Sequence, residues 1–519
     1  MYLTQNLRRS MQQTPDGIIS IFEGRKRSFA EFGQRIARYA GALHKLGLQP
    51  GDRVSMLALN SDAYLEYYLG TYWAGGVVNP LNTRLALPEI VFMLNDCGSR
   101  FLVMDRNFLE LVEPLRSQCP QLQAVICVGE DVSQADGVLS YEDLIAISEP
   151  VEDAMRRGDD LAGIYYTSGT TGRAKGAMLT HANIFTNSVG MVAEGAVGLG
   201  CVGLHSAPMF HLADGAFMNA MLAAGGCHVI VAQFDPVAVL EVIQHERVRD
   251  MLLVPTMIQM LVDHPKRTEY DLSSVQSIIY GASPIAEALL DRAMAAFPEA
   301  DFTQAYGQTE LSPVATLLSA EMHRETGRKL GLHKSNGRAA IGTEVIVADD
   351  NDQELPRGEV GEILVRGPGV MKGYWNLPEE TAAALRSGWM HTGDAGFMDE
   401  HGYVFLQDRV KDMIISGGEN VYSIEVENAV ALHPAVAQCA VVGIPSERWG
   451  EAVHAFVVFK PGQEATAEDI MAHCKQHIAG YKCPRSVEFI EAMPLSGAGK
   501  ILKRQLRAPY WEGHDRQVA

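Results

Sequence analysis

The chain has 519 residues, enough for about three structural units or for one large unit with a smaller one attached. Hydrophobic residues make up 47% of it and charged residues 20%, a composition that excludes a mostly disordered or collagen-like protein. The formal net charge of −20 would repel a phosphate backbone, so we expect no sequence-independent binding to nucleic acid. Any anionic ligand must therefore be held by local donors.

The cysteines and the amino terminus predict a cytoplasmic protein. The eight cysteines form no CxxC pair and no metal-ligand spacing, and a chain of this length needs no disulfides to fold, which fits a reducing cytosol. Residues 1–17 include two arginines but no apolar block of the kind that marks a secretory signal. Residues 222–234 are among the most apolar, but this stretch is too short to cross a bilayer, so we expect no integral membrane segment.

Strands and helices alternate through most of the chain before residue 337. Ser28 and Glu31 form a predicted capping box, the apolar residues after it have helical spacing, and Gly47 marks the end of that helix. Apolar runs that predict strands follow at residues 53–59, 101–104, 124–128, 229–232 and 251–254. Because helical segments separate these strands, the pattern indicates an α/β fold of parallel or mixed sheets covered by helices.

The pattern changes near residue 337 and again near residue 411. Between these points, short runs predict strands at residues 342–348, 361–365 and 402–406, which indicates a β-rich subdomain. A compact α+β unit then follows, with helices at 423–432 and from Thr466, and strands at 436–442, 453–459 and 486–490. We therefore predict two domains, residues 1–410 and 411–519, of which the second is long enough to fold alone.

The sharpest local motif is the polar loop of residues 166–176, YTSGTTGRAKG, which follows a strand-like apolar run. Its glycines let backbone amides face a ligand, its hydroxyls add donors and Lys175 adds a positive charge, so the loop can wrap a polyphosphate. It differs from the common phosphate loop, which requires glycine at position 174 and serine or threonine at position 176. A kinase or a simple NTPase is therefore not indicated.

This loop resembles the phosphate-binding signature of the adenylate-forming superfamily, which includes acyl-CoA synthetases, luciferases and peptide-synthetase adenylation domains. Four further motifs follow in the family's order: YGQTE at 306–310, GWMHTGD at 388–394, a hinge motif over 408–420, and PLSGAGKILKR at 494–504. Together they cover nearly the whole chain. The resemblance implies an ATP-dependent, AMP-forming enzyme with a large N-terminal domain and a small, mobile C-terminal domain.

The resemblance also implies the contacts with nucleotide and metal. The phosphates of ATP would be bound by Thr167, Ser168, Gly169, Thr170, Thr171, Gly172 and Lys175. The adenine would be framed by Gly281, Ala282, Ser283, Gln304, Ala305, Tyr306 and Gly307. Thr309 would contact the α-phosphate, Asp394 the ribose hydroxyls, and Arg409 the ribose or a phosphate. Glu310, together with Thr167, would hold Mg²⁺, whose preference for oxygen ligands suits a carboxylate combined with ATP oxygens.

The implied reaction has two steps. In the first, Lys500 and Mg²⁺ would neutralise the charges that meet when a carboxylate attacks the α-phosphorus of ATP, which gives an acyl-adenylate and pyrophosphate. The C-terminal domain would then turn about the hinge residue Lys411 and withdraw Lys500. In that second orientation Gly417 and Gly418 would line a tunnel for the pantetheine arm of coenzyme A.

The acid would bind between residues 208–215, residues 282–285 and the segment after the second nucleotide motif. His211 would gate the entry of the acid or stabilise the adenylate. A roomy apolar slot is predicted from small residues and apolar neighbours, namely Ala213, Gly215, Ala216, Ala282, Gly307, Phe210, Leu212, Met218, Met257 and Met260. Asp214 could be mistaken for the substrate-binding aspartate of amino-acid-activating relatives, but its place after His211 fits the acyl-CoA ligase pattern better.

We therefore predict an AMP-forming acid–thiol ligase that converts a hydrophobic carboxylic acid, with a medium- or long-chain fatty acid favoured, into its acyl-CoA. An aryl- or cinnamate-type CoA ligase stays open as an alternative. So does an acyl-AMP ligase that loads a carrier protein, although residues 320–411 show no extra segment of the kind such enzymes usually carry. The expected partners are the acid, ATP, Mg²⁺ and coenzyme A, and a homodimer stays open.

Overall fold

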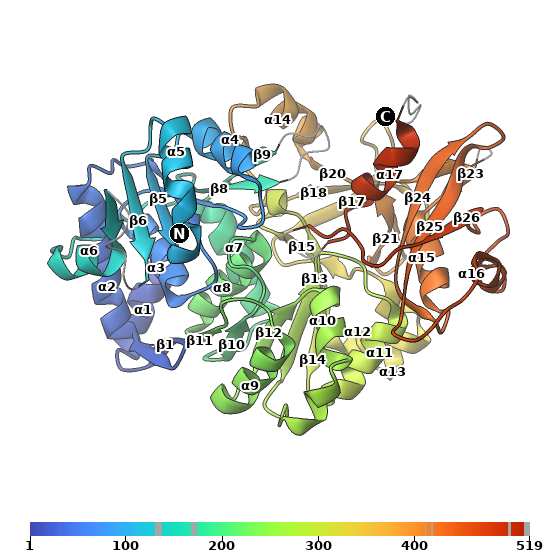
Figure 1. The fold of residues 1–519 in the computed structure, drawn as a ribbon, viewed down its shortest axis with the longest axis horizontal. Coiled ribbons are helices and arrows are strands. Elements are labelled where there is room, and N and C mark those ends of the chain that lie inside the picture. Colours follow the sequence, from blue (N-terminus) through green and yellow to red (C-terminus); the bar gives the residue numbers. More distant parts are fainter. Residues whose placement is uncertain (130–136, 168–173, 410–411, 417–418, 497–499, 513–519) are drawn as a thin grey trace.

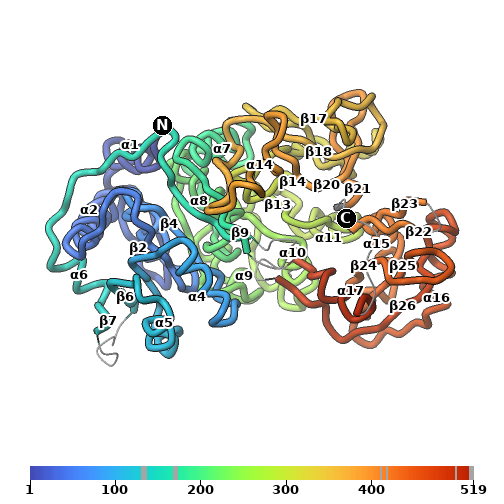
Figure 2. Tube along the Cα trace, turned by 90° about the horizontal axis from the view of Figure 1, so that it is seen from above, coloured from blue at the N-terminus to red at the C-terminus, as the bar shows by residue number. Residues whose placement is uncertain are grey.

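The computed structural model describes residues 1–129, 137–167, 174–409, 412–416, 419–496 and 500–512, and of Arg409 only the backbone. It confirms an α/β fold with two large sheets, a smaller β-rich layer and a separate C-terminal unit. Figures 1 and 2 show that the amino-terminal third and the carboxyl-terminal unit lie at opposite ends of the molecule, with the central part of the chain between them.

The largest sheet has nine strands in the order β16-β15-β14-β13-β12-β10-β11-β1-β2. The strands are β1 (Ile18–Phe22), β2 (Arg25–Ser28), β10 (Val202–His205), β11 (Cys227–Ile230), β12 (Asp250–Leu253), β13 (Ser277–Gly281), β14 (Asp301–Gly307), β15 (Val314–Leu318) and β16 (Arg338–Ala339). From β14 to β1 neighbouring strands are parallel. The carboxyl ends of β12, β13 and β14 therefore meet at one edge, where ligands of open α/β sheets commonly bind.

A second sheet has eight strands in the order β19-β9-β8-β4-β3-β5-β6-β7. They are β3 (Arg53–Leu57), β4 (Val77–Pro80), β5 (Phe101–Asp105), β6 (Ala124–Val128), β7 (Val138–Ser140), β8 (Leu161–Thr167), β9 (Lys175–Thr180) and β19 (Gly373–Tyr374). Strands β8 and β9 are antiparallel, and Thr167 pairs with Lys175 at their end. These two residues thus flank the part of the phosphate loop, residues 168–173, that lies outside the described ranges.

Helices cover both sheets. They are α1 (Gln5–Gln13), α2 (Phe29–Lys45), α3 (Asp62–Trp73), α4 (Leu87–Cys97), α5 (Val112–Gln118), α6 (Tyr141–Ile147), α7 (His181–Ala193), α8 (Leu212–Ala224), α9 (Pro236–Glu246), α10 (Pro255–Val262), α11 (Glu287–Ala296), α12 (Ala320–His323) and α13 (Glu325–Lys329). The predicted capping box starts α2: Glu31 N donates to Ser28 Oγ at 3.2 Å, and Ser28 N donates to the Glu31 carboxylate at 2.8 Å. This prediction is confirmed.

Helix α8 lies between the two large sheets. Its residues Phe217 and Met221 belong to the hydrophobic core against the nine-stranded sheet, whereas Met218 and Leu222 belong to the core of the eight-stranded sheet. The apolar stretch over residues 222–234 spans the end of this buried helix and strand β11, which has a parallel partner on each side and is almost wholly buried. Within the described ranges, none of the helices combines the length and the apolar character that a membrane span requires.

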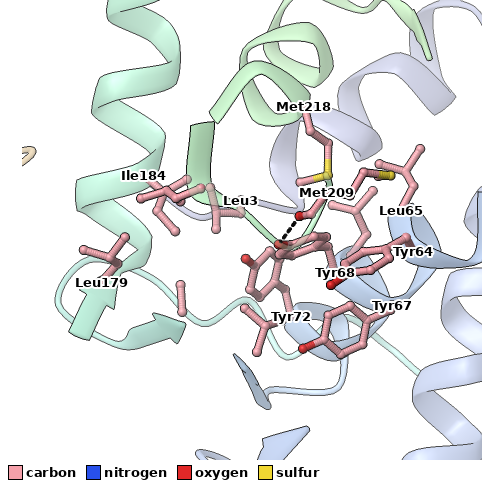
Figure 3. Close-up of a cluster of buried hydrophobic side chains, with 14 of the residues drawn as sticks. Leu3, Tyr64, Leu65, Tyr67, Tyr68, Tyr72, Leu179, Ile184, Met209 and Met218 are labelled. Atoms are coloured by element: carbon pink, nitrogen blue, oxygen red, sulfur yellow. Dashed lines mark hydrogen bonds between the residues drawn. The ribbon is translucent and has the colours of Figure 1, made fainter. Parts of the chain in front are cut away.

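A cluster of buried tyrosines holds the segment that precedes α8 (Figure 3). Tyr64, Tyr67, Tyr68 and Tyr72 all lie on α3, and each is at most 1% exposed. The Tyr68 hydroxyl donates to Met209 O at 2.9 Å, which is the hydrogen bond drawn in Figure 3. Because His211 follows two residues later, this contact helps to fix the backbone at the start of α8.

The β-rich subdomain predicted after residue 337 is confirmed as a four-stranded antiparallel sheet. Its strands are β17 (Glu344–Ala348), β18 (Gly361–Arg366), β20 (Met390–Met398) and β21 (Val404–Arg409), and it is accompanied by helix α14 (Pro378–Ala384). Strand β21 starts two residues later than the sequence predicts, because Gly402 belongs to a turn in which its N–H donates to Asp399 O at 3.1 Å.

The C-terminal unit has its own sheet and its own core. Its elements are β22 (Ile414–Ser416), β23 (Glu419–Val421), α15 (Ser423–Ala431), β24 (Val436–Ser446), β25 (Gly450–Phe459), α16 (Ala467–Cys474), β26 (Ser486–Phe489) and α17 (Lys503–Trp511). Strands β24 and β25 are longer than predicted because their ladder continues through Pro445 and Glu451 to the hairpin end. The chain leaves the four-stranded sheet at β21 and enters this sheet at β22. The predicted boundary at residue 411 falls in that link and stays a prediction.

Candidate active site

A pocket lies where the carboxyl ends of β12, β13 and β14 face the amino end of α8. It contains about 670 Å³ of space that protein atoms do not fill, part of it open to solvent. It is lined by Met191, His211, Ala213, Ala216, Leu252, Leu253, Val254, Ile279, Tyr280, Gly281, Ala282, Ala305, Tyr306, Gly307, Gln308, Thr309, Pro313, Val314 and Lys500. Lys500 belongs to the C-terminal unit, so the two parts of the chain meet at this pocket.

Close backbone packing explains the glycines at this edge. A Cβ atom on Gly281 would lie 2.1 Å from Ala305 O, and one on Gly307 would lie 1.8 Å from Pro313 O. Ala282 has a φ of +67°, a left-handed conformation that costs a residue with a side chain about 1 kcal/mol or more. The backbone itself therefore forms this wall of the pocket, and larger side chains at the two glycines would disrupt it.

Most of the residues predicted to frame adenine come together here. Gly281, Ala282, Ala305, Tyr306 and Gly307 line the pocket, as does Thr309, which was predicted to contact the α-phosphate. Two other predicted residues do not line it. Gln304 is buried inside the sheet, where β14 pairs with β13 on one side and β15 on the other. Ser283 directly follows Ala282 in the chain but is not among the residues that line the pocket.

Asp394 joins the second and third motifs of the sequence. It is 8% exposed, and its Oδ2 accepts hydrogen bonds from the Tyr306 hydroxyl at 2.8 Å and from Gln308 Nε2 at 2.9 Å. Strand pairing places the backbone of Arg409 opposite Asp394, while the Arg409 side chain lies outside the described part of the structure. Gln308 was missed as a site residue, although it stands inside the YGQTE motif.

Glu310 is the centre of a second polar cluster. Its Oε1 accepts from the Tyr374 hydroxyl at 2.9 Å and from Thr167 Oγ1 at 3.3 Å. Lys175 Nζ lies 5.3 Å from the centroid of the Tyr374 ring. Burial, and then the charge of Glu310, raise the pKa of Tyr374 well above its ordinary value, so this hydroxyl stays protonated and donates. No sequence pattern marked Tyr374, which reaches the site through strand β19.

The Glu310 cluster fits a magnesium ion that also binds phosphate. None of the described residues donates a hydrogen bond to Glu310 Oε2, so this oxygen can face a cation. Among the described residues, no group of three His, Cys, Asp or Glu side chains could enclose a metal. Mg²⁺ commonly takes one or two carboxylates and completes its shell with water and substrate phosphates. The single carboxylate of Glu310, with the Thr167 hydroxyl beside it, is consistent with this mode of coordination.

His211 and Lys500 face the same pocket. His211 caps α8, and its Nδ1 accepts from Ala213 N at 3.2 Å, so in the neutral ring the proton is on Nε2. Burial, reinforced by the positive charge of Lys500, lowers the pKa of His211 to about 4. Lys500 is paired with Ser496: Ser496 N donates to Lys500 O at 2.7 Å, and Lys500 N donates to Ser496 Oγ at 3.1 Å. Near neutral pH the site therefore contains a neutral donor, His211, and the ammonium of Lys500.

Asp214 is turned away from the pocket. Its Oδ2 lies 2.8 Å from His205 Nδ1, and His205 Nε2 lies 2.8 Å from His228 Nδ1. All three side chains are at most 1% exposed. The carboxylate is thus engaged with a buried histidine pair, which agrees with the expectation that Asp214 does not bind a substrate ammonium group.

Only some of the residues predicted to form the acid slot line this pocket. His211, Ala213, Ala216, Ala282 and Gly307 line the pocket, but Gly215, Phe210, Leu212, Met218, Met257 and Met260 do not. Met260 is 49% exposed, and Met218 packs into the tyrosine cluster of Figure 3, because the helical period points these residues away from the slot. The apolar wall is supplied instead by residues that were not predicted, namely Met191, Leu252, Leu253, Val254, Ile279, Pro313 and Val314.

Eight predicted site residues lie outside the described ranges. They are Ser168, Gly169, Thr170, Thr171 and Gly172 of the phosphate loop, the hinge residue Lys411, and Gly417 and Gly418 of the thiol tunnel. Their roles stay predictions.

A buried histidine behind the pocket predicts a pH effect on stability. His323 Nε2 accepts from the hydroxyl of Tyr280, which lines the pocket, at 2.7 Å, and burial lowers the pKa of His323 to about 4. The unfolded chain, with a histidine pKa of about 6.5, binds more protons than the folded chain between these values, so stability falls as the pH decreases through this window. We expect His323→Gln to reduce the loss of unfolding free energy between pH 7 and pH 5 by about 1–2 kcal/mol.

Urea unfolding of both proteins at the two pH values measures this difference. His401→Gln, at an exposed position, is the control. An equal loss in the wild type and in His323→Gln would show that His323 is not held neutral in the folded protein.

The strand-edge pocket, with a lysine supplied by the C-terminal unit, is the arrangement expected of an adenylate-forming enzyme, and comparison with known proteins identifies the family. The model of the AMP-binding enzyme family matches residues 7–375, and that of the AMP-binding enzyme C-terminal domain matches residues 425–500. The chain therefore belongs to the AMP-binding enzyme family. It is an AMP-forming acid–CoA ligase that uses ATP, Mg²⁺ and coenzyme A.

The similarity to several relatives extends over almost the whole chain. A feruloyl-CoA synthase from Amycolatopsis sp is 40% identical over 485 residues, which are 92% of this chain and 93% of that protein. The medium/long-chain-fatty-acid–CoA ligase FadD8 of Mycobacterium tuberculosis is 37% identical over 504 residues, covering 94% of this chain and 86% of the relative. The crystal structure of ATP-bound MatB from Rhodopseudomonas palustris matches with a TM-score of 0.89 at 32% identity, over 99% of this chain and 100% of MatB.

Proposed function

We propose that this ligase activates a hydrophobic monocarboxylic acid, with medium- and long-chain fatty acids favoured, and transfers the acyl group to coenzyme A. One observation carries this proposal: apart from His211 and Lys500, much of the pocket is lined by apolar side chains of α7, β12, β13 and β15. Met191, Leu252 and Val314 belong to the buried core there, so an acyl chain entering the slot would replace water with apolar contacts. The resemblance to FadD8 supports the same class of acid.

The charges of the pocket argue against acids with a polar tail. Among the described lining residues, Lys500 alone carries a permanent charge, and it lies where the reacting carboxylate would bind. A second carboxylate or an ammonium group at the far end of the acid would be buried without a partner, which is strongly unfavourable. Asp214, the nearby acidic residue, faces His205 rather than the slot. Dicarboxylic acids and amino acids are therefore expected to be poor substrates.

The proposed chemistry assigns a role to each polar cluster. A carboxylate oxygen of the acid bonds to the α-phosphorus of ATP, the bond from that phosphorus to the bridging oxygen breaks, and pyrophosphate leaves. Lys500 stabilises the negative charge that develops, and His211 donates from Nε2 to the acyl carboxylate. Glu310 would hold Mg²⁺ against the phosphates, and Asp394 the ribose hydroxyls. The sulfur of coenzyme A then attacks the acyl carbon, and AMP leaves.

An aromatic acid is the second candidate. The feruloyl-CoA synthase relative favours it, and so do the small side chains of Ala213 and Ala216, which leave width beside the reacting carboxylate. A planar ring needs a wide slot close to the carboxylate, whereas an alkyl chain needs a long, narrow one. Acids that differ in these two dimensions therefore separate the candidates.

A panel of acids in one assay tests the proposal. The purified protein is incubated with Mg·ATP, coenzyme A and one acid from butanoic to palmitic acid, cinnamic or ferulic acid, or a dicarboxylic acid, and thioester and AMP are measured by mass spectrometry. We expect kcat/KM for the best saturated acid to exceed that for a dicarboxylic acid of equal length by about 100-fold or more. A preference for cinnamic or ferulic acid would favour the second candidate. Adenylate without CoA thioester would indicate transfer to a carrier protein instead.

Two opposite substitutions test whether the apolar wall selects the acid. Ala216→Met places a long side chain in the pocket wall, and Met191→Ala removes one from it. We expect Ala216→Met to lower kcat/KM for long acids by about tenfold or more while butanoate is spared, and Met191→Ala to shift the preference toward longer acids. Thermal unfolding of each variant controls for general damage. Equal losses for all acids in both variants would show that these residues do not line the acyl site.

A further inference from the structure

Helix α17 connects the active-site lysine to a buried charge cluster. Lys503, the first residue of α17, stands three residues after Lys500. Its Nζ contacts Ser423 Oγ and lies 2.8 Å from Glu427 Oε1, and both partners belong to α15. The side chains of Lys503 and Glu427 are 19% and 17% exposed, so the ion pair is largely shielded from solvent. A displacement of this cluster would therefore displace the segment that carries Lys500.

The same cluster reaches across the link between the two parts of the chain. Asp408 belongs to β21, where it pairs with Ala395 of β20 in the four-stranded sheet, and it is 4% exposed. Its Oδ2 accepts a hydrogen bond from Ser423 N, at the first turn of α15 in the C-terminal unit. Asp408 is thus held by the N-terminal part, while Ser423, Glu427 and Lys503 are held by the C-terminal unit.

Lys503 interacts electrostatically with acidic residues in both parts of the chain. Burial alone would lower the pKa of the Lys503 ammonium, but the negative charges of Glu427 and Asp408 raise it above its ordinary value. Burial raises the pKa of Asp408, and the largest opposing effect is the positive charge of Lys503. One turn along α17, Arg507 Nη1 lies 3.4 Å from Asp412 Oδ1, just after the link. Two positive side chains of α17 therefore interact with acidic residues on either side of residues 410–411: Lys503 with Asp408, and Arg507 with Asp412.

We propose that Lys503 is a positioning residue that locks the C-terminal unit, through Asp408, in the orientation in which Lys500 lines the acid pocket. Asp408 and Lys503 lie on opposite sides of the link, so a rotation of the C-terminal unit about this link separates them. Separating a buried charge from its partners is costly, so the lock favours the orientation for adenylate formation over the orientation for thioester formation. The kinetic consequences rest on the proposed function, whereas the locked orientation does not.

Kinetics of the separate half-reactions test the lock. We expect Lys503→Met to slow adenylate formation, measured as acid-dependent pyrophosphate release, by about tenfold, while thioester formation from supplied acyl-AMP stays within about twofold of the wild type. Lys503→Arg, which keeps the charge, should restore the first half-reaction. Lys482→Met is the matched control, because Lys482 pairs with Glu425 of the same helix α15 at 2.7 Å, is 21% exposed and makes this contact inside the C-terminal unit. Equal loss of both half-reactions in Lys503→Met would overturn the proposal.

A distance measurement tests the lock without catalysis. Spin labels at the exposed positions Leu199 and Leu432, one in each part of the chain, report the orientation of the C-terminal unit in the presence of Mg·ATP. We expect one main distance in the wild type and in Lys482→Met, and an additional population of other distances in Lys503→Met and in Asp408→Asn, which keeps an acceptor for Ser423 N. Unchanged distances in both variants would overturn the proposal. If the wild type forms no adenylate, the proposed function fails, and the distances alone decide the lock.

Discussion

Replacing Lys500 with alanine should slow acyl-adenylate formation by about a hundredfold to a thousandfold, while acyl-AMP supplied from outside is still converted to acyl-CoA. The reason is geometric. Lys500 lines the pocket beside His211, where it adds the positive charge needed as the acid and the α-phosphate of ATP approach each other. The second half-reaction needs no such neutralisation, since the adenylate is already a mixed anhydride with a good leaving group.

The two half-reactions can be measured separately for this variant. Pyrophosphate release with acid and Mg·ATP reports the first, and thioester formation from synthetic acyl-AMP and coenzyme A reports the second. Lys475→Ala, at an exposed position of the C-terminal unit, should leave both unchanged. An equal loss in both half-reactions of Lys500→Ala would contradict the role assigned to this lysine.

Glu310→Gln should lower the rate of adenylate formation by about a hundredfold and should raise the Mg²⁺ concentration needed for half of the maximal rate. The glutamine side chain can still accept hydrogen bonds from Tyr374 and Thr167, so the main change is the loss of the carboxylate charge. A hard divalent cation prefers a charged oxygen ligand, and the described part of the site offers no cluster of acidic side chains to replace it.

Tyr374→Phe is the matched control for Glu310→Gln. It removes one hydrogen bond to Glu310 but keeps the negative charge, so we expect a loss of about tenfold or less and little change in the Mg²⁺ requirement. Initial rates of pyrophosphate release over a Mg²⁺ titration measure both effects. A Mg²⁺ requirement in Glu310→Gln that equals that of the wild type would rule out Glu310 as a metal ligand.

The parts of the fold that depend on local signals could be predicted from the sequence. The capping box predicted at Ser28 forms, and the helix predicted to start at Thr466 also begins with one, because a hydroxyl and an acidic side chain three residues apart satisfy the first amides of a helix in any surroundings. Helix α3 could not be predicted from apolar periodicity, because it is buried along its whole length and shows no apolar stripe. The extra length of β24 and β25 comes from backbone pairing, which apolar patterns do not reveal.

The site divides in the same way. Residues inside short motifs, such as Tyr306, Asp394 and Lys500, could be found because the order of the motifs marked them. Met191 and Val314 could not, since they come from segments far apart in the chain that meet only when α7 packs beside β15. Met218 and Met260 were predicted near the slot from proximity in sequence, which ignores the direction in which a helix points each side chain.

Several predictions stay untested by the fold. The eight cysteines are free thiols in the structure, and the cytoplasmic location inferred from the cysteine pattern stays a prediction. The same holds for a homodimer, for the domain boundary at residue 411, and for the roles of the phosphate loop and the thiol tunnel.

The most direct test of the account is the stoichiometry of a single assay. Purified protein, Mg·ATP, coenzyme A and a saturated fatty acid should yield AMP, pyrophosphate and acyl-CoA in equal amounts, and leaving out coenzyme A should leave enzyme-bound acyl-adenylate. Release of ADP and phosphate, or the absence of AMP with every acid in the panel, would contradict it.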